Sequence, residues 1–271
     1  MTRAPSLRAL GFLSAWGRGT AALPDDARAA AGGRPVVSCG RPEREGERFR
    51  RATRGGLLAL AAVEAALDDG GAGRAAIAGE RTALIYVTAA AYAPSNRRFI
   101  EGRGGSIHFA ETAPAVVPAE VAIELGVSGP YAIFIGGPPA TLRAISHGAM
   151  LLEAGACDRA LVLAVEVFEE CADLYARARR LTGSPLVEAA GCLWLERGRG
   201  DLRLESGGGG RGAVALRRRL GETFCCEPLA ALDLWRTRGA AGTLELGGRW
   251  RGETARLVWT DVITAARASA A

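Results

Sequence analysis

Residues 129–166 read GPYAIFIGGPPATLRAISHGAMLLEAGACDRALVLAVE, and this stretch decides the fold. Its pattern predicts a buried strand from Tyr131 to Ile135, a helix from about Ala140 to Ala154, and a second buried strand from Arg159 to Val165. A tight Gly-Gly-Pro-Pro turn at 136–139 separates the first strand from the helix. A strand, a crossover helix and a second strand form a βαβ unit, which indicates an α/β fold.

Segments before and after this unit extend the same architecture. Thr82–Thr88 is a continuous apolar, β-branched run, which is typical of a central strand covered on both faces. Phe49–Gly71 predicts an amphipathic helix that ends at a pair of glycines. Further elements are expected as a first strand at Leu10–Trp16, a helix at Val117–Leu125, strands within Pro185–Gly198 and at Asp201–Ser206, and surface loops at Gly17–Glu47 and Ala89–Gly105.

At residues 129–166 the chain resembles the amino-terminal half of the β-ketoacyl synthases, members of the thiolase-like fold. The nucleophile segment of that family has the form G-P, a strand, A-C-S-G at the strand-to-helix elbow, an Ala-rich helix, and then G-x-x-D-x-A-L-V-G-G-x-E. Counting forward from Gly129 or backward from Asp158, the family's catalytic Cys falls without a gap on Pro138. The resemblance implies a thiolase-like half-fold with a mixed, mostly parallel sheet, helices on both faces, and a buried helix after the elbow at Pro138.

Proline at the nucleophile position removes two groups that ketosynthase chemistry needs. A thiolate at a helix start is activated by the local dipole, and the backbone N–H of the same residue helps to form the oxyanion hole. Pro138 has neither a nucleophilic side chain nor an N–H, and losing one oxyanion donor alone slows such reactions on the order of 100-fold or more. We therefore expect no intrinsic ketosynthase activity, no catalytic residue at this site, and a degenerate elbow formed by Gly136, Gly137, Pro138 and Pro139.

A relocated nucleophile is the main alternative. The candidates are Ser146, Cys157, Cys171 and Ser184, and for all four a structural role is favoured, because activation needs a nearby base and the chain has only His108 and His147. Arg143, Ser146 and His147 share a narrow polar stripe of the predicted helix, where contacts to solvent, a partner or an acyl tunnel are expected.

Composition limits the classes of ligand. All 34 basic residues are Arg, and the net charge is only +5. Because the sequence has no nucleic-acid-binding signature, we expect a solvated basic face and no binding of nucleic acid. An Arg patch could instead dock an acidic acyl carrier protein. The six cysteines show no C-x-x-C spacing and are expected to be reduced and buried. Neither a metal site nor a cofactor is expected. The apolar run Ala9–Trp16 is too short to span a membrane, so a cytoplasmic location is expected.

The resemblance covers about Leu10 to Ser206, which predicts one ketosynthase-like domain at residues 1–206. Residues 207–271 are expected to form a Gly-rich linker and a short extension of unassigned structure, with a helical turn at Leu229–Trp235 and a short hairpin or edge strands at Thr243–Leu246 and Arg256–Trp259. In the thiolase-like fold the helix after the elbow lies between two halves. With the second half absent, its apolar surface needs cover from the tail, another copy or a partner, so an oligomer is expected.

The leading hypothesis is a non-catalytic subunit that resembles chain-length factors of type II fatty acid, polyketide or polyene synthase systems. Its expected partners are an active β-ketoacyl synthase in a heterodimer or a second copy in a homodimer, with an acyl carrier protein as a further candidate. The alternatives are an acyltransferase or thioesterase that uses a relocated nucleophile on acyl thioesters, and a scaffold that binds no ligand.

Overall fold

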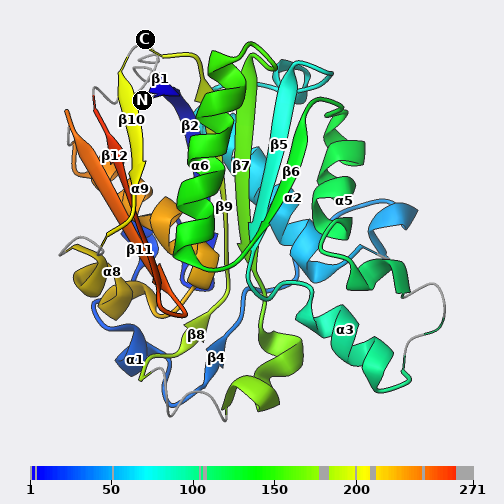
Figure 1. Cartoon of the computed structure of the whole chain (residues 1–271). Coiled ribbons are helices and arrows are strands. Elements are labelled where there is room, and N and C mark those ends of the chain that lie inside the picture. Colours follow the sequence, from blue (N-terminus) through cyan, green and yellow to red (C-terminus); the bar gives the residue numbers. More distant parts are fainter. Residues whose placement is uncertain are drawn as a thin grey trace.

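A six-stranded mixed sheet with the strand order β3-β2-β9-β7-β5-β6 forms the centre of the molecule (Figure 1). The computed structural model describes residues 2–3, 5–50, 52–103, 105, 109–176, 183–198, 200–207, 212–239 and 242–260. Four strands of this first sheet run in one direction, and β9 and β3 run in the other. The six strands are β2 (Ser6–Ser14), β3 (Gly17–Arg18), β5 (Thr82–Thr88), β6 (Tyr131–Ile135), β7 (Arg159–Glu166) and β9 (Ala189–Glu196).

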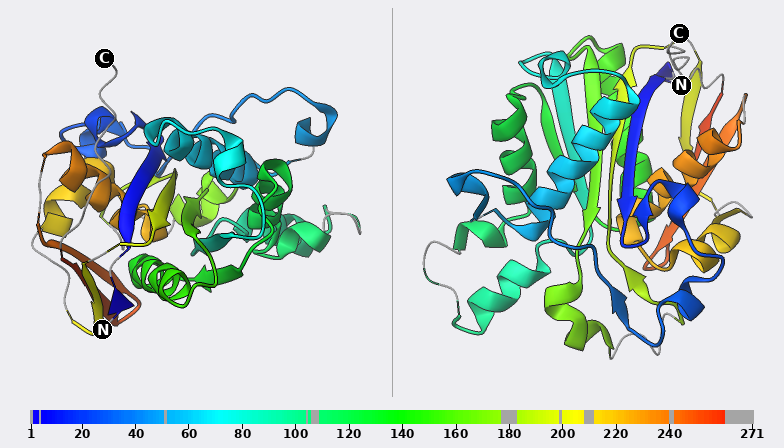
Figure 2. Two further views of the ribbon diagram at one scale, coloured as in Figure 1. Left: turned by 90° about the horizontal axis from the view of Figure 1, so that it is seen from above. Right: turned by 180° about the vertical axis from the view of Figure 1, so that it is seen from behind.

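Helices cover both faces of the first sheet. On one face lie α2 (Arg54–Asp69) and α5 (Val116–Leu125), and Figure 2 shows α2 crossing the back of the sheet. On the other face lies α6 (Pro138–Glu153), the crossover helix between β6 and β7. Because both faces are covered, every residue of β5 is buried, as the apolar run in its sequence predicts.

A second, antiparallel sheet closes over the outer side of α6. Its strands follow the order β1-β10-β12-β11. Burial alternates along β11 and β12, with one face toward α6 and the other toward solvent. The two helices α8 (Gly212–Leu220) and α9 (Glu227–Thr237) precede the β11–β12 hairpin. The strands are β1 (Thr2–Arg3), β10 (Asp201–Glu205), β11 (Leu244–Trp250) and β12 (Glu253–Trp259).

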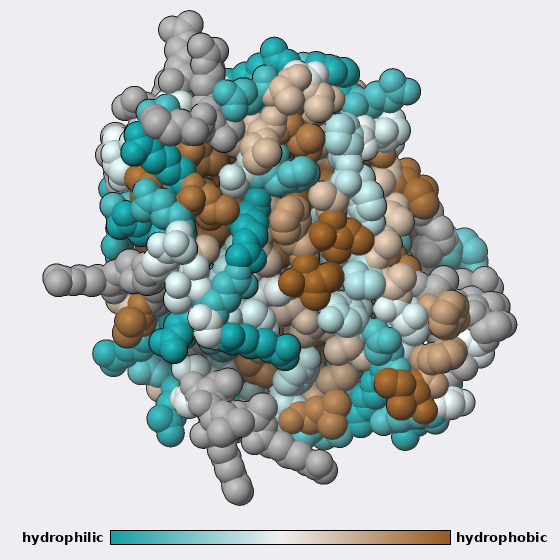
Figure 3. Space-filling model, viewed as in Figure 1, coloured by the Kyte–Doolittle hydropathy of each residue, from teal (hydrophilic) through white to brown (hydrophobic). Residues whose placement is uncertain are grey.

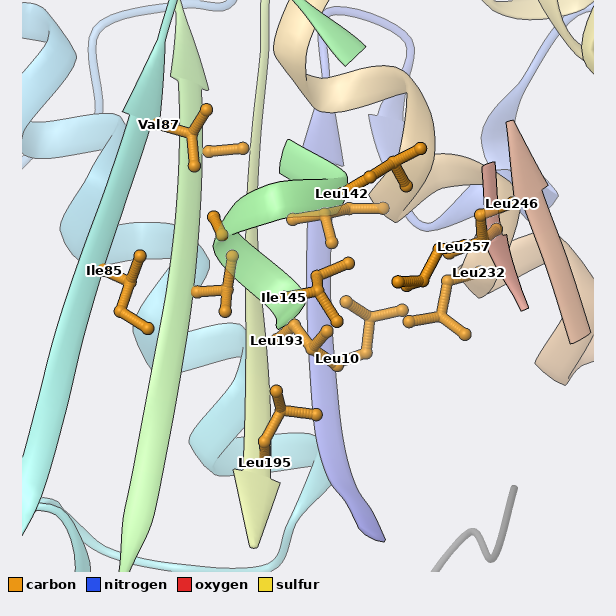
Figure 4. Packing of buried hydrophobic residues seen from close by; sticks show 14 of the residues in the cluster. Leu10, Ile85, Val87, Leu142, Ile145, Leu193, Leu195, Leu232, Leu246 and Leu257 are labelled. Carbon is orange, nitrogen blue, oxygen red and sulfur yellow. The ribbon is translucent and has the colours of Figure 1, made fainter. Parts of the chain in front are cut away.

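The core between the two sheets is built around α6. Figure 4 shows Leu142 and Ile145 of α6 between Leu193 of the first sheet and Leu257 of the second. All four of these side chains are fully buried. The tail of the chain therefore supplies the cover that the apolar surface of this helix needs, which is one of the three sources expected from the sequence.

The remaining elements are short and lie outside these layers. They are α1 (Ala27–Ala30), β4 (Val36–Val37), α3 (Ala93–Ile100), β8 (Leu186–Val187), and the 3-10 helices η1 (Thr20–Ala22), η2 (Glu47–Arg50), η3 (Arg74–Ala76), η4 (Ala110–Thr112), η5 (Glu169–Cys171) and η6 (Phe224–Cys226). The first of these, α1, is capped by the side chain of Asp26.

Most predicted elements are confirmed, and several predictions are wrong in part. The surface loop predicted at Gly17–Glu47 contains β3, α1 and β4, and the helix predicted from about Ala140 begins at Pro138.

The strand at Tyr131–Ile135 has its predicted bounds but is not buried. Among the described residues it is an edge strand that pairs only with β5, and Tyr131 and Ile135 are 53% and 52% exposed. The first strand begins at Ser6 and ends at Ser14, not at Leu10–Trp16. The predicted loop at Ala89–Gly105 contains α3. Pro94 does not prevent this helix, because it stands in the first turn, where the N–H that proline lacks would have no partner within the helix.

Two predictions on the tail have different outcomes. The predicted hairpin is present as β11 and β12, each longer than expected from the sequence. The glycines at 208–210 lie outside the described residues. The predicted domain boundary at Ser206 stays a prediction, although residues on both sides of it contribute strands to the second sheet, since β10 pairs with β12.

Candidate functional site

The candidate site is the elbow, residues 136–139, which joins the end of β6 to the start of α6. The carboxyl ends of β5, β6 and β7 meet at this edge of the sheet, because the three strands are parallel. The Gly136 N–H donates to the carbonyl oxygen of Thr88 at 2.9 Å, which fixes the turn to β5. Gly136 has a φ of 154°, a value that side-chain-bearing residues rarely adopt.

The first two residues of α6 have no backbone N–H group, so the start of the helix lacks two hydrogen-bond donors. Pro138 and Pro139 occupy these positions, and Gly137, the N-cap residue, has no side chain to cap the helix. The next N–H, from Ala140, donates to the carbonyl oxygen of Gly137 at 2.9 Å. The helix start therefore lacks the two amides that would otherwise face an anion or an oxyanion.

Aromatic side chains from distant segments pack on the elbow. A Cβ added to Gly137 would lie 2.5 Å from Cδ2 of Trp250, so the indole ring lies directly on the backbone of residue 137. The Trp250 ring contacts Phe224, which contacts Phe168, with ring centroids 4.7 and 5.1 Å apart. Phe168 in turn contacts Tyr175 at 5.3 Å. We call these four residues the aromatic row; it leads from the elbow to the segment after β7.

Beside the elbow, the buried carboxylate of Glu166 ends β7. It accepts hydrogen bonds from the N–H groups of Ala89 and Ala90 at 2.6 and 2.9 Å, and from the Thr88 hydroxyl at 3.4 Å. Burial nevertheless raises the pKa of Glu166 to about 7, because desolvation of the charged form outweighs these hydrogen bonds. The same burial raises the pKa of the nearby Cys225 thiol well above its usual value. Glu166 connects β7 to the chain that leaves β5.

A basic cavity of about 580 Å³ lies at the amino-terminal end of α2. Four arginines line it, and one of them, Arg54, is neutralised by Glu170 and the buried Glu188. Arg41 donates to the carbonyl oxygens of Phe49 and Ala52, so its guanidinium is held in place. The full lining is Arg41, Arg50, Ala52, Thr53, Arg54, Pro94, Ser95, Arg98, Glu111 and Glu170.

Among the described residues, no hydrogen bond joins Cys157, Cys171 or Ser146 to His147. Cys157 and Cys171 are buried, and burial raises the pKa of both thiols, which disfavours the nucleophilic thiolate. Ser146 and Ser184 are partly buried. The His147 ring packs on Phe134 of β6, with ring centroids 5.7 Å apart. His108 lies outside the described residues.

Arg143, Ser146 and His147 lie on the side of α6 that the sheets leave uncovered. Arg143 forms an ion pair with Glu253 at the start of β12, and the neighbouring Met150 is 54% exposed. Figure 3 shows hydrophobic side chains gathered over β6 on the same side of the molecule. We call the two half-exposed residues of β6, Tyr131 and Ile135, the β6 edge surface.

Two further observations concern metals and membranes. Within the described ranges, no group of three or more His, Cys, Asp or Glu side chains is arranged to hold a metal ion. None of the described helices is long and apolar enough to cross a membrane.

Sequence reasoning missed Trp250 and Phe224. Neither belongs to a motif. Trp250 reaches the elbow from more than one hundred residues away along the chain, and Phe224 packs on Trp250. A weak signal for the turn that carries Trp250 was the Arg251-Gly252 pair, which suits a two-residue hairpin with positive φ at both positions, observed at 48° and 86°.

Comparison with known proteins identifies the family. Residues 40–185, more than half of the chain, match the family described as β-ketoacyl synthase, N-terminal domain. No curated protein was found to match the sequence.

Three solved structures illustrate the similarity of the fold. The complex AntDE:AntF, a type II polyketide synthase acyl-carrier protein with its ketosynthase bound to the hexaketide, matches with a TM-score of 0.74 and 13% identity, over 97% of this chain and 100% of the matched chain. The ishigamide ketosynthase/chain length factor matches with a TM-score of 0.72 and 16% identity, over 96% and 100%. The ketosynthase ApeO in complex with its chain length factor ApeC, from Xenorhabdus doucetiae, matches with a TM-score of 0.61 and 14% identity, over 96% and 99%.

At these identities the similarity establishes the fold. The predicted fold class, a thiolase-like half-fold with a mixed sheet, helices on both faces and a buried helix after the elbow, is confirmed. Because the match covers 97% of the chain, it includes the second sheet as well as the first. The likeness expected from residues 129–166 therefore extends into the tail.

Proposed function

The chain belongs to the β-ketoacyl synthase family, and from this premise we propose that it is a non-catalytic subunit that pairs with a catalytically complete synthase. The system in which it acts would be a type II fatty acid, polyketide or polyene synthase. Two of the similar structures are described as a ketosynthase with a chain length factor, and that description supports this choice.

The observation that carries the proposal is Pro138 at the first helical residue of α6. A ketosynthase needs a nucleophile at the elbow and an N–H that stabilises the oxyanion, and proline supplies neither. The chain retains the elbow, the parallel strands around it and the buried helix. The chain therefore keeps the fold of a ketosynthase around the elbow but lacks the nucleophile and the oxyanion donor at residue 138.

The β6 edge surface supports pairing. In the described structure β6 pairs on one side only, so its other side presents unpaired backbone groups next to the exposed side chains of Tyr131 and Ile135. An edge strand of this kind is a template for pairing with a strand from another chain. Arg143 and His147 border this surface and would contribute polar contacts to a synthase partner or to a second copy.

The basic cavity supports a contact with an acyl carrier protein. Arg98 is exposed at this cavity, Arg50 forms an ion pair with Glu47 at 3.1 Å, and Glu170 is engaged by Arg54. An acidic carrier protein would be attracted to the excess positive charge here. A carrier protein is part of one of the similar complexes, and this adds to the proposal.

The test is co-expression with a ketosynthase encoded beside this chain. We expect a stable complex on size-exclusion chromatography, and condensation activity that requires the active-site Cys of the synthase and not any residue of this chain. A monomer that associates with no such synthase would overturn the proposal. Burial disfavours the thiolate forms of Cys157 and Cys171, which argues against either cysteine as a relocated nucleophile.

A further inference from the structure

The β11–β12 hairpin is fitted to the elbow by two glycines. At Gly137 a Cβ would lie 2.5 Å from the Trp250 ring, and at Gly248 a Cβ would lie 2.7 Å from Cβ of Pro138. Side-chain carbons do not approach so closely, so both positions must be glycine for the hairpin to lie where it does. One glycine belongs to the elbow and the other to the hairpin, which shows that the contact is complementary on both sides.

Behind Trp250 the aromatic row continues without a gap. Its three ring pairs are tilted at 65°, 81° and 81°, near the edge-to-face arrangement that aromatic rings favour. Phe168, in the middle, has no exposed surface. The row consists of aromatic rings and begins at the elbow, where an alkyl chain attached to residue 138 would start.

Local geometry holds the row in place. Phe224 and Arg251 are the two non-glycine residues with positive φ in the described part of the chain, at 46° and 48°. Such a conformation is unfavourable for a residue with a side chain and persists only where the surrounding packing imposes it. The ion pair of Arg143 with Glu253 ties the hairpin to α6 beside Trp250.

We infer that Trp250 closes the elbow to acyl chains, and that Trp250 and Phe224 fill the space that an acyl chain attached at this position would need. The identity of the excluded ligand rests on the proposed function, while the closure itself is a property of this chain alone. In a complex with a synthase, growing chains would then be held entirely by the partner at its own elbow.

Cysteine labelling tests the closure on the isolated chain, so its outcome is independent of partner binding. Pro138→Cys places a thiol of similar volume at the elbow, and the six native cysteines are buried, which keeps background labelling low. The probes are methyl and octyl methanethiosulfonate. We expect Cys labelling in Pro138→Cys to be about 100-fold slower than in the unfolded chain, because reaction requires local opening of the hairpin.

Removing the ring should open the site. In Pro138→Cys/Trp250→Ala we expect both reagents to react at least about tenfold faster than in Pro138→Cys, whereas Pro138→Cys/Trp235→Ala, which loses another partly buried tryptophan, should not change the rate. Equal rates with and without Trp250 would overturn the closure. A methyl rate that rises while the octyl rate does not would overturn the acyl chain as the excluded ligand.

A second variant covers the case in which Trp250→Ala does not fold. Glu253→Gln keeps the ring and removes the ion pair with Arg143 at the tip of the hairpin. Faster labelling of Cys in Pro138→Cys/Glu253→Gln than in Pro138→Cys supports the closure, and an unchanged rate contradicts it.

Discussion

The guanidinium of Arg54, at the first residue of α2, lies against the fully buried carboxylate of Glu188, with Nη2 2.6 Å from Oε1. Glu188 also accepts the N–H groups of Cys39, Phe168 and Glu169. Burial would by itself lower the pKa of Arg54, but hydrogen bonds to Glu170 and Glu188 raise it above its ordinary value. One carboxylate thus joins the start of α2 to the segment after β7 and to the chain after β4.

We therefore expect Glu188→Ala to destabilise the chain by about 3–5 kcal/mol, because it leaves a buried guanidinium without part of its charge partner and three amides without an acceptor. Glu188→Gln should lose less, since one oxygen remains to accept. Urea unfolding measures both. Glu153→Ala, at an exposed position of α6, is the control and should change stability by less than about 0.5 kcal/mol. A loss from Glu188→Ala as small as that of the control would contradict the assignment.

Glu166 predicts a pH dependence of stability. Its pKa is raised from 4.5 to about 7 in the folded chain, so the protonated form is favoured by folding. The stability that Glu166 contributes is fully present below about pH 4.5 and is lost as the pH rises through about 7. The difference between about pH 5 and about pH 8 is on the order of 3 kcal/mol.

The matching variant is Glu166→Gln, which cannot ionise. We expect its unfolding free energy to change less between these two pH values than that of the wild type, when both are measured by urea denaturation. The comparison of slopes removes the contribution of other titrating groups. Parallel pH profiles for the two proteins would show that Glu166 does not titrate in this range.

Gly137→Ala should be destabilising by about 1–3 kcal/mol, because its Cβ would enter the Trp250 ring. Gly73→Ala is the control, since nothing lies within 4 Å of a Cβ at residue 73. In a Trp250→Ala background the effect of Gly137→Ala should largely disappear, and a double-mutant cycle measures this coupling. Additive effects would mean that the ring and the elbow do not touch.

Ile135→Arg should weaken binding to the synthase partner at least about tenfold, because it places a charge on the exposed edge of β6. The folded monomer should keep its thermal stability, since Ile135 is already half exposed. Val214→Arg is the control, an equally drastic change at a residue of α8 that is 78% exposed. Equal losses of binding in both variants would argue against the β6 edge as the interface.

Arg98→Glu should weaken binding of an acyl carrier protein by about tenfold at low salt and by much less at high salt, as expected for an exposed charge. Fluorescence anisotropy with a labelled carrier protein measures the affinity. Arg238→Glu makes the same charge change at an exposed residue just after α9 and should have little effect. If the two variants behave alike, only the net charge matters and the cavity is not the docking site.

The parts of the fold that were predictable are those with local signals. The strand at Tyr131–Ile135 is marked by an apolar run and has its predicted bounds. The turn after it is shorter than predicted, because α6 begins at Pro138 and not at about Ala140. Exposure of that strand was not predictable, because an apolar run does not reveal whether a second strand pairs with each of its sides.

The closure of the elbow was not predictable either. Trp250 meets Gly137 only because the second sheet folds over α6, and no periodicity within either segment encodes that contact. The helix α3 was missed for a different reason: Pro94 and the polar residues after it read as a loop, although proline is well tolerated in a first helical turn.

The second sheet has a consequence for folding during synthesis, because two of its strands are the last to be made. Helix α6 leaves the ribosome long before β11 and β12, the strands that cover it. During that interval the side of α6 that carries Leu142 and Ile145 is not yet covered by the second sheet. The nascent chain therefore exposes an apolar helix surface, which chaperones bind. A chain stalled before residue 244 should therefore bind chaperones that act on nascent chains, and it should aggregate when released. The finished chain should do neither.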